Sequence, residues 1–178
     1  MLTSEKISTA FNRIVQTLKR KPSFGMATAV SRTVVTDGLT CTVRERDWSF
    51  TVDMSEEVGG NAAGPTPGVY GRAALGSCLA IGYMMRASTM GICIQSLSVE
   101  IQADFDDGAL FGTSPDTVSP GYSEVRYIIS VETEAEESLV MELLDEADRH
   151  SPYLNVFSRP QTCLRQVHIS SPKKLNHG

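Results

Sequence analysis

The chain has 178 residues, of which 41% are hydrophobic and 21% are charged, an ordinary composition for a globular domain with its own core. Its formal net charge of −5 argues against nucleic acid or an anionic membrane as a partner. Arg86 interrupts the longest apolar stretch, and Glu5 and Lys6 do not fit a signal peptide. We therefore expect one domain over residues 1–178, located in the cytoplasm.

The four cysteines are Cys41, Cys78, Cys93 and Cys163. No two of them form a C-x-x-C pair, and no histidine lies at zinc-ligand spacing from them. The pattern therefore predicts neither a metal site nor another cofactor. In a reducing compartment, four free and mostly buried thiols are the simplest expectation.

The first part of the chain predicts a helix followed by three strands. Apolar residues recur at helical spacing from Ile7 to Leu18, and Pro22 ends the pattern, so residues 1–22 form a helical extension. Residues 25–37 and 39–44 are typical of two strands joined by an Asp-Gly turn, with a third strand at residues 48–53. Cys41 falls in the apolar phase of its strand, which predicts a core position.

Residues 66–90 predict one long central helix. Pro67 suits its first turn, and no proline follows within the helix. The segment is apolar almost all round, which favours burial on every side. Small residues recur at spacings of three and four, and Cys78 is one of them. This stripe consists of Gly71, Ala74, Cys78 and Gly82.

The remaining chain predicts a hairpin, a second helix and a last strand. Residues 97–105 and 125–131 alternate apolar and polar side chains, and we expect them to pair across a long loop. An acidic start and an apolar stripe predict a helix over residues 136–149, followed by a short helical piece to residue 157. Residues 163–169 are expected to form the last strand. Strands and helices are grouped rather than alternating, so the class is α+β.

Three pieces of sequence around the central helix resemble the OsmC/Ohr family of thiol-dependent peroxidases. They are Gly59-Gly60-Asn61, Gly64-Pro65-Thr66-Pro67 and Ala73-Ala74-Leu75-Gly76-Ser77-Cys78. The resemblance implies antiparallel sheets packed around the central helix in an intertwined homodimer, with the site near the subunit interface. It also implies that Cys78 attacks a hydroperoxide, that an arginine held by a glutamate activates the thiolate, and that a second cysteine resolves the sulfenic acid.

The sequence departs from the family pattern at three places. Gly68 follows Pro67 where the family commonly has a glutamate, and Ser151 precedes Pro152 where the family has its second cysteine. The activating arginine is not placed, although Cys78 needs a separate cation because it lies roughly 18 Å from the helix start, beyond the reach of the helix dipole. The candidates on the early strands are Arg32, Arg44 and Arg46.

Two other arginines share the central helix with Cys78. At 100° per residue, Arg72 and Arg86 are offset from Cys78 by about 120° and about 80°. Both are therefore expected to point away from the face that carries the thiol.

Two functions remain open. The first is a one-cysteine thiol peroxidase that acts on organic or inorganic hydroperoxides through Cys78, with an external thiol as reductant. Cys41, Cys93 or Cys163 could resolve the oxidised thiol only if folding brings it near Cys78. The alternative is a non-catalytic relative that binds a small apolar ligand or a partner in the former pocket, with Cys78 a buried helix residue. A serine hydrolase is less consistent, since the G-x-S-x-G motif is absent.

Overall fold

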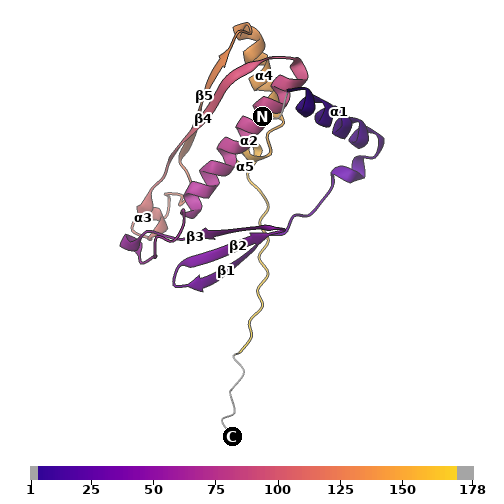
Figure 1. Cartoon of the computed structure of the whole chain (residues 1–178). Coiled ribbons are helices and arrows are strands. Elements are labelled where there is room, and N and C mark those ends of the chain that lie inside the picture. The colour runs from indigo at the N-terminus through magenta and orange to yellow at the C-terminus, as the bar shows by residue number, and fades with distance from the viewer. Residues whose placement is uncertain (1–3, 172–178) are drawn as a thin grey trace.

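The computed structural model of the chain describes residues 4–171 and confirms the α+β class (Figure 1). The α-helices are α1 (Ser4–Arg20), α2 (Pro67–Met90), α3 (Asp107–Leu110), α4 (Glu137–Arg149) and α5 (Pro152–Ser158). The strands are β1 (Arg32–Asp37), β2 (Thr40–Glu45), β3 (Trp48–Val52), β4 (Ile94–Asp104) and β5 (Glu124–Thr133). Two short 3-10 helices are η1 (Pro22–Gly25) and η2 (Glu56–Val58). Within residues 4–171, no helix is long and apolar enough to cross a membrane.

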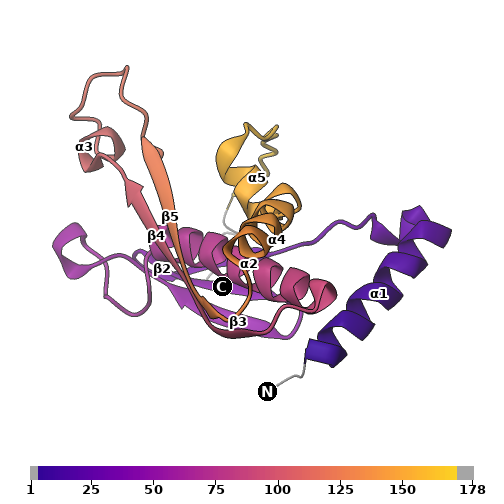
Figure 2. The same cartoon turned by 90° about the horizontal axis from the view of Figure 1, so that it is seen from above.

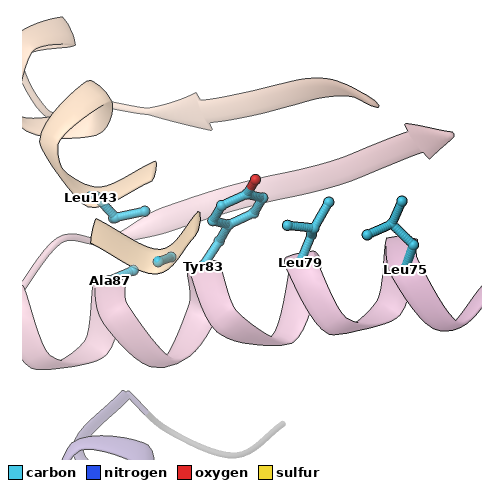
Figure 3. Close-up of a cluster of buried hydrophobic side chains, with 6 residues drawn as sticks. Leu75, Leu79, Tyr83, Ala87 and Leu143 are labelled. Atoms are coloured by element: carbon cyan, nitrogen blue, oxygen red, sulfur yellow. The ribbon is translucent and has the colours of Figure 1, made fainter. Parts of the chain in front are cut away.

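Helix α2 is the element around which the others pack, as Figures 1 and 2 show. Pro67 occupies its first turn, and Gly91 ends it in a left-handed conformation with φ 72°. The predicted central helix is thus confirmed. Its buried residues recur at four-residue spacing along one side and face β4, β5 and α4 (Figure 3). The hydrophobic ones are Leu75, Leu79, Tyr83 and Ala87, and Ser88 is buried next to the last of them.

Strands β4 and β5 form the antiparallel hairpin that the alternating sequence predicted. Leu97 pairs with Val131 and Val99 with Ile129, so the apolar side chains of both strands share the face that packs on α2. A Cβ atom built on Gly76 would meet Ile101 at 3.2 Å, so the helix lies very close to the sheet here. Helix α4 adds Leu143 and Ala147 to the same core.

A half-buried carboxylate, that of Asp148, ties three elements of this core together. Tyr83 of α2 donates a hydrogen bond to Asp148 at 2.7 Å, and Tyr127 of β5 donates one to the other oxygen at 2.9 Å. Burial and the neighbouring carboxylate raise the pKa of Tyr127 to about 12, and they raise the pKa of Tyr83 further. Both phenols therefore stay protonated as donors, and α2, β5 and α4 are held in fixed register.

Strands β1 to β3 form a separate antiparallel sheet in the order β1-β2-β3, with the predicted turn at Asp37. The sheet joins the rest of the molecule at the start of α2. There the Tyr70 hydroxyl donates to the Thr51 carbonyl at 2.8 Å, and the Phe50 and Tyr70 rings lie 4.9 Å apart. The sheet thus depends on the first turns of α2 for its position.

Asp53 organises the loop between β3 and α2. Its side chain is 1% exposed, and it accepts four hydrogen bonds. Burial alone would raise the pKa of Asp53, but these hydrogen bonds lower it below its ordinary value. The donors are the Thr40 hydroxyl and the backbone N–H groups of Met54, Asn61 and Ala63.

Two glycines of the same loop are required by close backbone packing. A Cβ atom on Gly60 would lie 2.1 Å from the Met54 carbonyl oxygen, and one on Gly64 would lie 2.6 Å from that of Thr51. Only glycine avoids these collisions. These two glycines therefore shape the entry into α2, although they lie 14 and 18 residues before Cys78 in the sequence.

Several expectations about secondary structure are wrong. The first strand begins only at Arg32, because residues 26–31 have no pairing partner among the described residues. Residues 163–169 form no strand, since no described strand pairs with them. Figure 1 shows the segment after Arg159 leading away from the body. The long loop after β4 contains α3, whose first turn Asp106 caps. The tail after Pro172 lies outside the described residues.

Expectations about burial also need correction. Helix α2 is not buried all round, because Ile81 is 60% exposed on the side away from the sheet. Cys41 is half-buried rather than a core residue, and Cys93 and Cys163 are exposed. These three thiols lie in β2, in the turn after α2 and in the segment after α5, outside the core that α2, β4, β5 and α4 share.

Candidate functional site

Cys78 lines a pocket of about 400 Å³ between α1, α2 and the junction of α4 with α5. The walls are mostly apolar, with polar or ionisable groups contributed by a few side chains. The lining residues are Phe11, Cys78, Ile81, Gly82, Met85, Arg86, Ala147, His150, Ser151 and Pro152. A half-buried thiol in an apolar pocket has both access and protection from bulk water.

Ser151 is the nearest polar neighbour of the thiol. Its Oγ lies 3.5 Å from the Cys78 Sγ, and it is the N-cap of α5, where it accepts a hydrogen bond from the Leu154 N–H at 3.3 Å. Because the capping bond uses an oxygen lone pair, the hydroxyl hydrogen remains available to the sulfur. The structure therefore brings together the two positions that the sequence singled out.

Arg86 lines the same pocket as Cys78, which its angular offset from the thiol did not indicate. The offset describes only the direction of the Cα–Cβ bond, whereas a long arginine side chain can reach the rim of a pocket beside its own face. Its Nη2 lies 3.4 Å from Glu146 of α4, and its guanidinium lies 5.5 Å from the Phe11 ring centre. Helices α1 and α4 thus hold this arginine from two sides.

Glu146 is shared by three positively chargeable side chains. Arg149 pairs with it, Arg86 reaches it from α2, and the His150 Nδ1 lies 3.6 Å from its carboxylate and 2.8 Å from its carbonyl oxygen. The hydrogen bond from Arg149 lowers the pKa of Glu146, burial opposes this, and the charges of Arg149, Arg86 and His150 lower it further. Glu146 is therefore ionised at neutral pH.

Sequence reasoning missed this second half of the site. Phe11, Arg86, Glu146 and His150 come from elements that meet only in the folded chain. The four-residue spacing of Cys78, Gly82 and Arg86 was the one local signal that could have indicated Arg86.

The early-strand arginines lie elsewhere within the chain. Arg32 and Arg44 line a shallow pocket on the β1–β2 face, and Arg46 occupies the β2–β3 turn with φ 50°. None of the three lines the Cys78 pocket. The same holds for Cys41, Cys93 and Cys163, so within residues 4–171 no second thiol shares the pocket.

Two further features of the described chain concern metal binding and a second pocket. Among residues 4–171, no group of three or more histidine, cysteine, aspartate or glutamate side chains could hold a metal ion. A larger pocket of about 620 Å³ lies at the start of α2, where Arg72 donates to the Tyr122 hydroxyl at 3.3 Å. The Tyr122 hydroxyl donates to the Gly68 carbonyl at 3.3 Å, so it packs beside the position where the family has a glutamate.

Known proteins share this architecture. The model of the family described as OsmC-like protein matches residues 59–163. No curated protein matches the sequence. An OsmC-like protein from Mycoplasma pneumoniae has a similar structure, with TM-score 0.63 and 17% identity over 74% of this chain and 87% of that chain.

Two other solved structures are similar to this chain. The organic hydroperoxide resistance protein OsmC from Legionella pneumophila gives TM-score 0.56 and 18% identity, covering 75% of this chain and 90% of that one. An organic hydroperoxide resistance protein from Elizabethkingia anophelis gives TM-score 0.54 and 16% identity, covering 75% and 89%. At these identities the structural likeness speaks for the fold, whereas the family model covers more than half of the sequence. The chain belongs to the OsmC-like family.

Proposed function

We propose that this protein is a one-cysteine, thiol-dependent peroxidase that reduces hydroperoxides at Cys78. The observation that carries the proposal is a half-buried thiol in an apolar pocket of about 400 Å³, next to a hydroxyl at 3.5 Å and an arginine that also lines the pocket. Similar structures include organic hydroperoxide resistance proteins, which act on the same class of substrate by name.

The reaction divides into an oxidative and a reductive half. The Cys78 thiolate attacks the hydrogen-bearing oxygen of a hydroperoxide, the S–O bond forms as the O–O bond breaks, and the alkoxide takes a proton from solvent. The sulfenic acid then condenses with an external thiol, which releases water and leaves a mixed disulfide. A second external thiol attacks that disulfide and restores Cys78. The sum is one hydroperoxide and two thiols converted to alcohol, water and a disulfide.

An external reductant follows from the position of the other cysteines. Ser151 stands beside Cys78 where a resolving cysteine would be needed, and a serine hydroxyl cannot form a disulfide. A reducing compartment such as the cytoplasm supplies small thiols for this step. The test is whether stoichiometric cumene hydroperoxide transfers one oxygen atom to Cys78.

Replacing Ser151 by cysteine is expected to convert the protein into a two-cysteine enzyme. The Cys78 Sγ and Ser151 Oγ lie 3.5 Å apart, so a shift of roughly 1.5 Å would bring two sulfurs to bonding distance. After one equivalent of peroxide, the S151C variant should lose two hydrogens instead of gaining oxygen, as intact-mass spectrometry can measure. Ser158→Cys, at the far end of α5, is the matched control and should still gain oxygen at Cys78. If the S151C variant gained oxygen without forming a disulfide, residues 78 and 151 would not be adjacent as proposed.

We also propose that the protein is a homodimer whose interface covers the outer side of α2 and the β1–β3 sheet. Large apolar side chains are exposed on both: Ile81 is 60% exposed and Trp48 is 77% exposed. Leu164 and Ile169, in the unpaired extended segment, are 89% and 94% exposed. Exposed apolar side chains that gather on one face are typical of protein–protein interaction sites.

The dimer is expected to persist at micromolar concentration, because burial of this surface stabilises each subunit. Multi-angle light scattering should give twice the mass of one chain for the wild type. For the Ile81→Asp variant, the measured mass should move toward that of one chain. Leu139→Asp, an exposed apolar position on α4, is the control and should leave the mass unchanged. A single-chain mass for the wild type would refute the proposal.

A further inference from the structure

We propose that the Ser151 hydroxyl donates a hydrogen bond to the Cys78 thiolate and stabilises the sulfur in its reactive, ionised form. The inference rests on the proposed peroxidase function and adds a second residue to its chemistry. Its basis is a contact between side chains of two different elements, in which the Ser151 Oγ lies 3.5 Å from the Cys78 Sγ. The position at which the family pattern has a resolving cysteine thus acts on the same sulfur in another way.

The direction of this hydrogen bond follows from the other contact of the hydroxyl. Within residues 4–171, the Ser151 Oγ has two hydrogen-bond partners, the Cys78 sulfur and the Leu154 N–H. The N–H group can only donate, so it uses an oxygen lone pair and leaves the hydroxyl hydrogen for the sulfur. A thiolate carries no hydrogen and can only accept. Once Cys78 is ionised, Ser151 is therefore the donor.

The backbone fixes Ser151 on both sides. Its N–H donates to the Asp148 carbonyl at 3.1 Å, and its own carbonyl accepts from the Asn155 N–H at 3.1 Å. Ser151 is only 8% exposed, so little water competes for its hydroxyl. A donor that is already in place when the thiol ionises needs no reorganisation, and a hydrogen bond to the charged form of a group favours that form.

The helix that carries the thiol also anchors the hydroxyl. Tyr83 lies five residues after Cys78 on α2 and donates to one carboxylate oxygen of Asp148 at 2.7 Å, while Tyr127 donates to the other at 2.9 Å. The backbone carbonyl of Asp148 in turn accepts the hydrogen bond from the Ser151 N–H. This short chain of contacts connects the two groups and keeps the hydroxyl beside the sulfur.

Few other groups near the pocket can carry a charge that acts on Cys78. The ionisable side chains are Arg86, His150 and Glu146, the last of which contacts the other two without lining the pocket. The residues that α1 and α5 contribute to the lining are not ionisable. A substitution at residue 151 leaves all three charged side chains in place, so a change in the ionisation of the thiol then reports the loss of the hydroxyl.

The test follows iodoacetamide alkylation of Cys78 against pH in the full-length protein, with peptide mass spectrometry to separate Cys78 from the other cysteines. The rate at the alkaline plateau reports access to the sulfur, and the pH of half-maximal rate reports its ionisation. For Ser151→Ala and Ser151→Gly, we expect the half-maximal pH to rise by about one unit, which slows alkylation about tenfold at neutral pH.

Both substitutions are needed because Ser151 also caps α5. Glycine is nearly as good an N-cap as serine, whereas alanine is a poor one, so the pair separates loss of the hydroxyl from loss of the cap. Ser158→Ala removes a hydroxyl from the other end of α5 and should leave the profile unchanged.

An unchanged profile for Ser151→Gly, or an equal shift for Ser158→Ala, would overturn our assignment. Alkylation requires no peroxide. A wild type that fails to reduce peroxide would therefore reject the proposed function, while the alkylation profiles would still decide whether Ser151 stabilises the thiolate.

Discussion

Cys78→Ser is expected to abolish peroxide reduction completely. A serine hydroxyl is not ionised at neutral pH and cannot store the transferred oxygen, so no step of the cycle remains. The wild type should gain one oxygen atom after one equivalent of cumene hydroperoxide, located on Cys78 by peptide mapping. With excess dithiothreitol, it should consume peroxide over many turnovers. The variant should show neither the mass gain nor any consumption above the rate of the buffer.

The matched controls are Cys93→Ser and Cys163→Ser, because both cysteines are exposed and lie outside the pocket. Each variant should keep the wild-type rate. Retained turnover in Cys78→Ser, or oxygen found on Cys93 or Cys163 instead, would reject Cys78 as the nucleophile. An unreactive wild type with an intact fold would favour the alternative of a ligand-binding protein in the former pocket.

The second large effect is expected for Asp53→Asn, which should lower the midpoint of thermal unfolding by at least about 5 °C. In all four of its hydrogen bonds the Asp53 carboxylate is the acceptor. An asparagine offers only one acceptor oxygen and turns an NH₂ group toward at least one of these donors, inside a site that water does not reach. Circular dichroism melts of the two proteins at neutral pH measure the difference.

The same substitution should flatten the acid dependence of stability. Asp53 has a folded-state pKa below its unfolded value of about 4. Its contribution is therefore present above that pH and is lost as pH falls through the lower folded value. The wild type should lose stability below about pH 4 more steeply than Asp53→Asn. Asp47→Asn, an exposed turn position, is the control; equal melting of the wild type and Asp53→Asn would contradict the proposed loop network.

Local patterns predicted most of the fold because the elements concerned are stabilised by their own sequence neighbours. Pro67 and Gly91 mark the ends of α2, and the alternation from Leu97 onward placed β4 and its pairing with β5. The strand expected at residues 163–169 did not form, because strand formation depends on a partner that sequence periodicity does not supply.

The residues of the candidate site also fall into two groups, those that the sequence indicated and those that only folding brings together. The motif around Cys78 and the position of Ser151 were visible in the sequence, and the folded chain places them 3.5 Å apart. Arg86 and Glu146 are 60 residues apart in the chain and meet through the packing of α4 on α2. Phe11 arrives from α1 in the same manner. Such contacts depend on tertiary structure, and no helical or strand periodicity encodes them.

Gly60 and Gly64 also determine which changes this chain can accumulate over evolutionary time. Any other residue at either position would collide with the backbone, whatever happens at the thiol. Purifying selection on these two positions therefore acts through folding, and it continues to act in a lineage that no longer needs the chemistry. Loss of the reactive sulfur and loss of the loop are independent mutational events. Descendants of this chain would therefore keep the loop sequence long after they had lost the catalytic function.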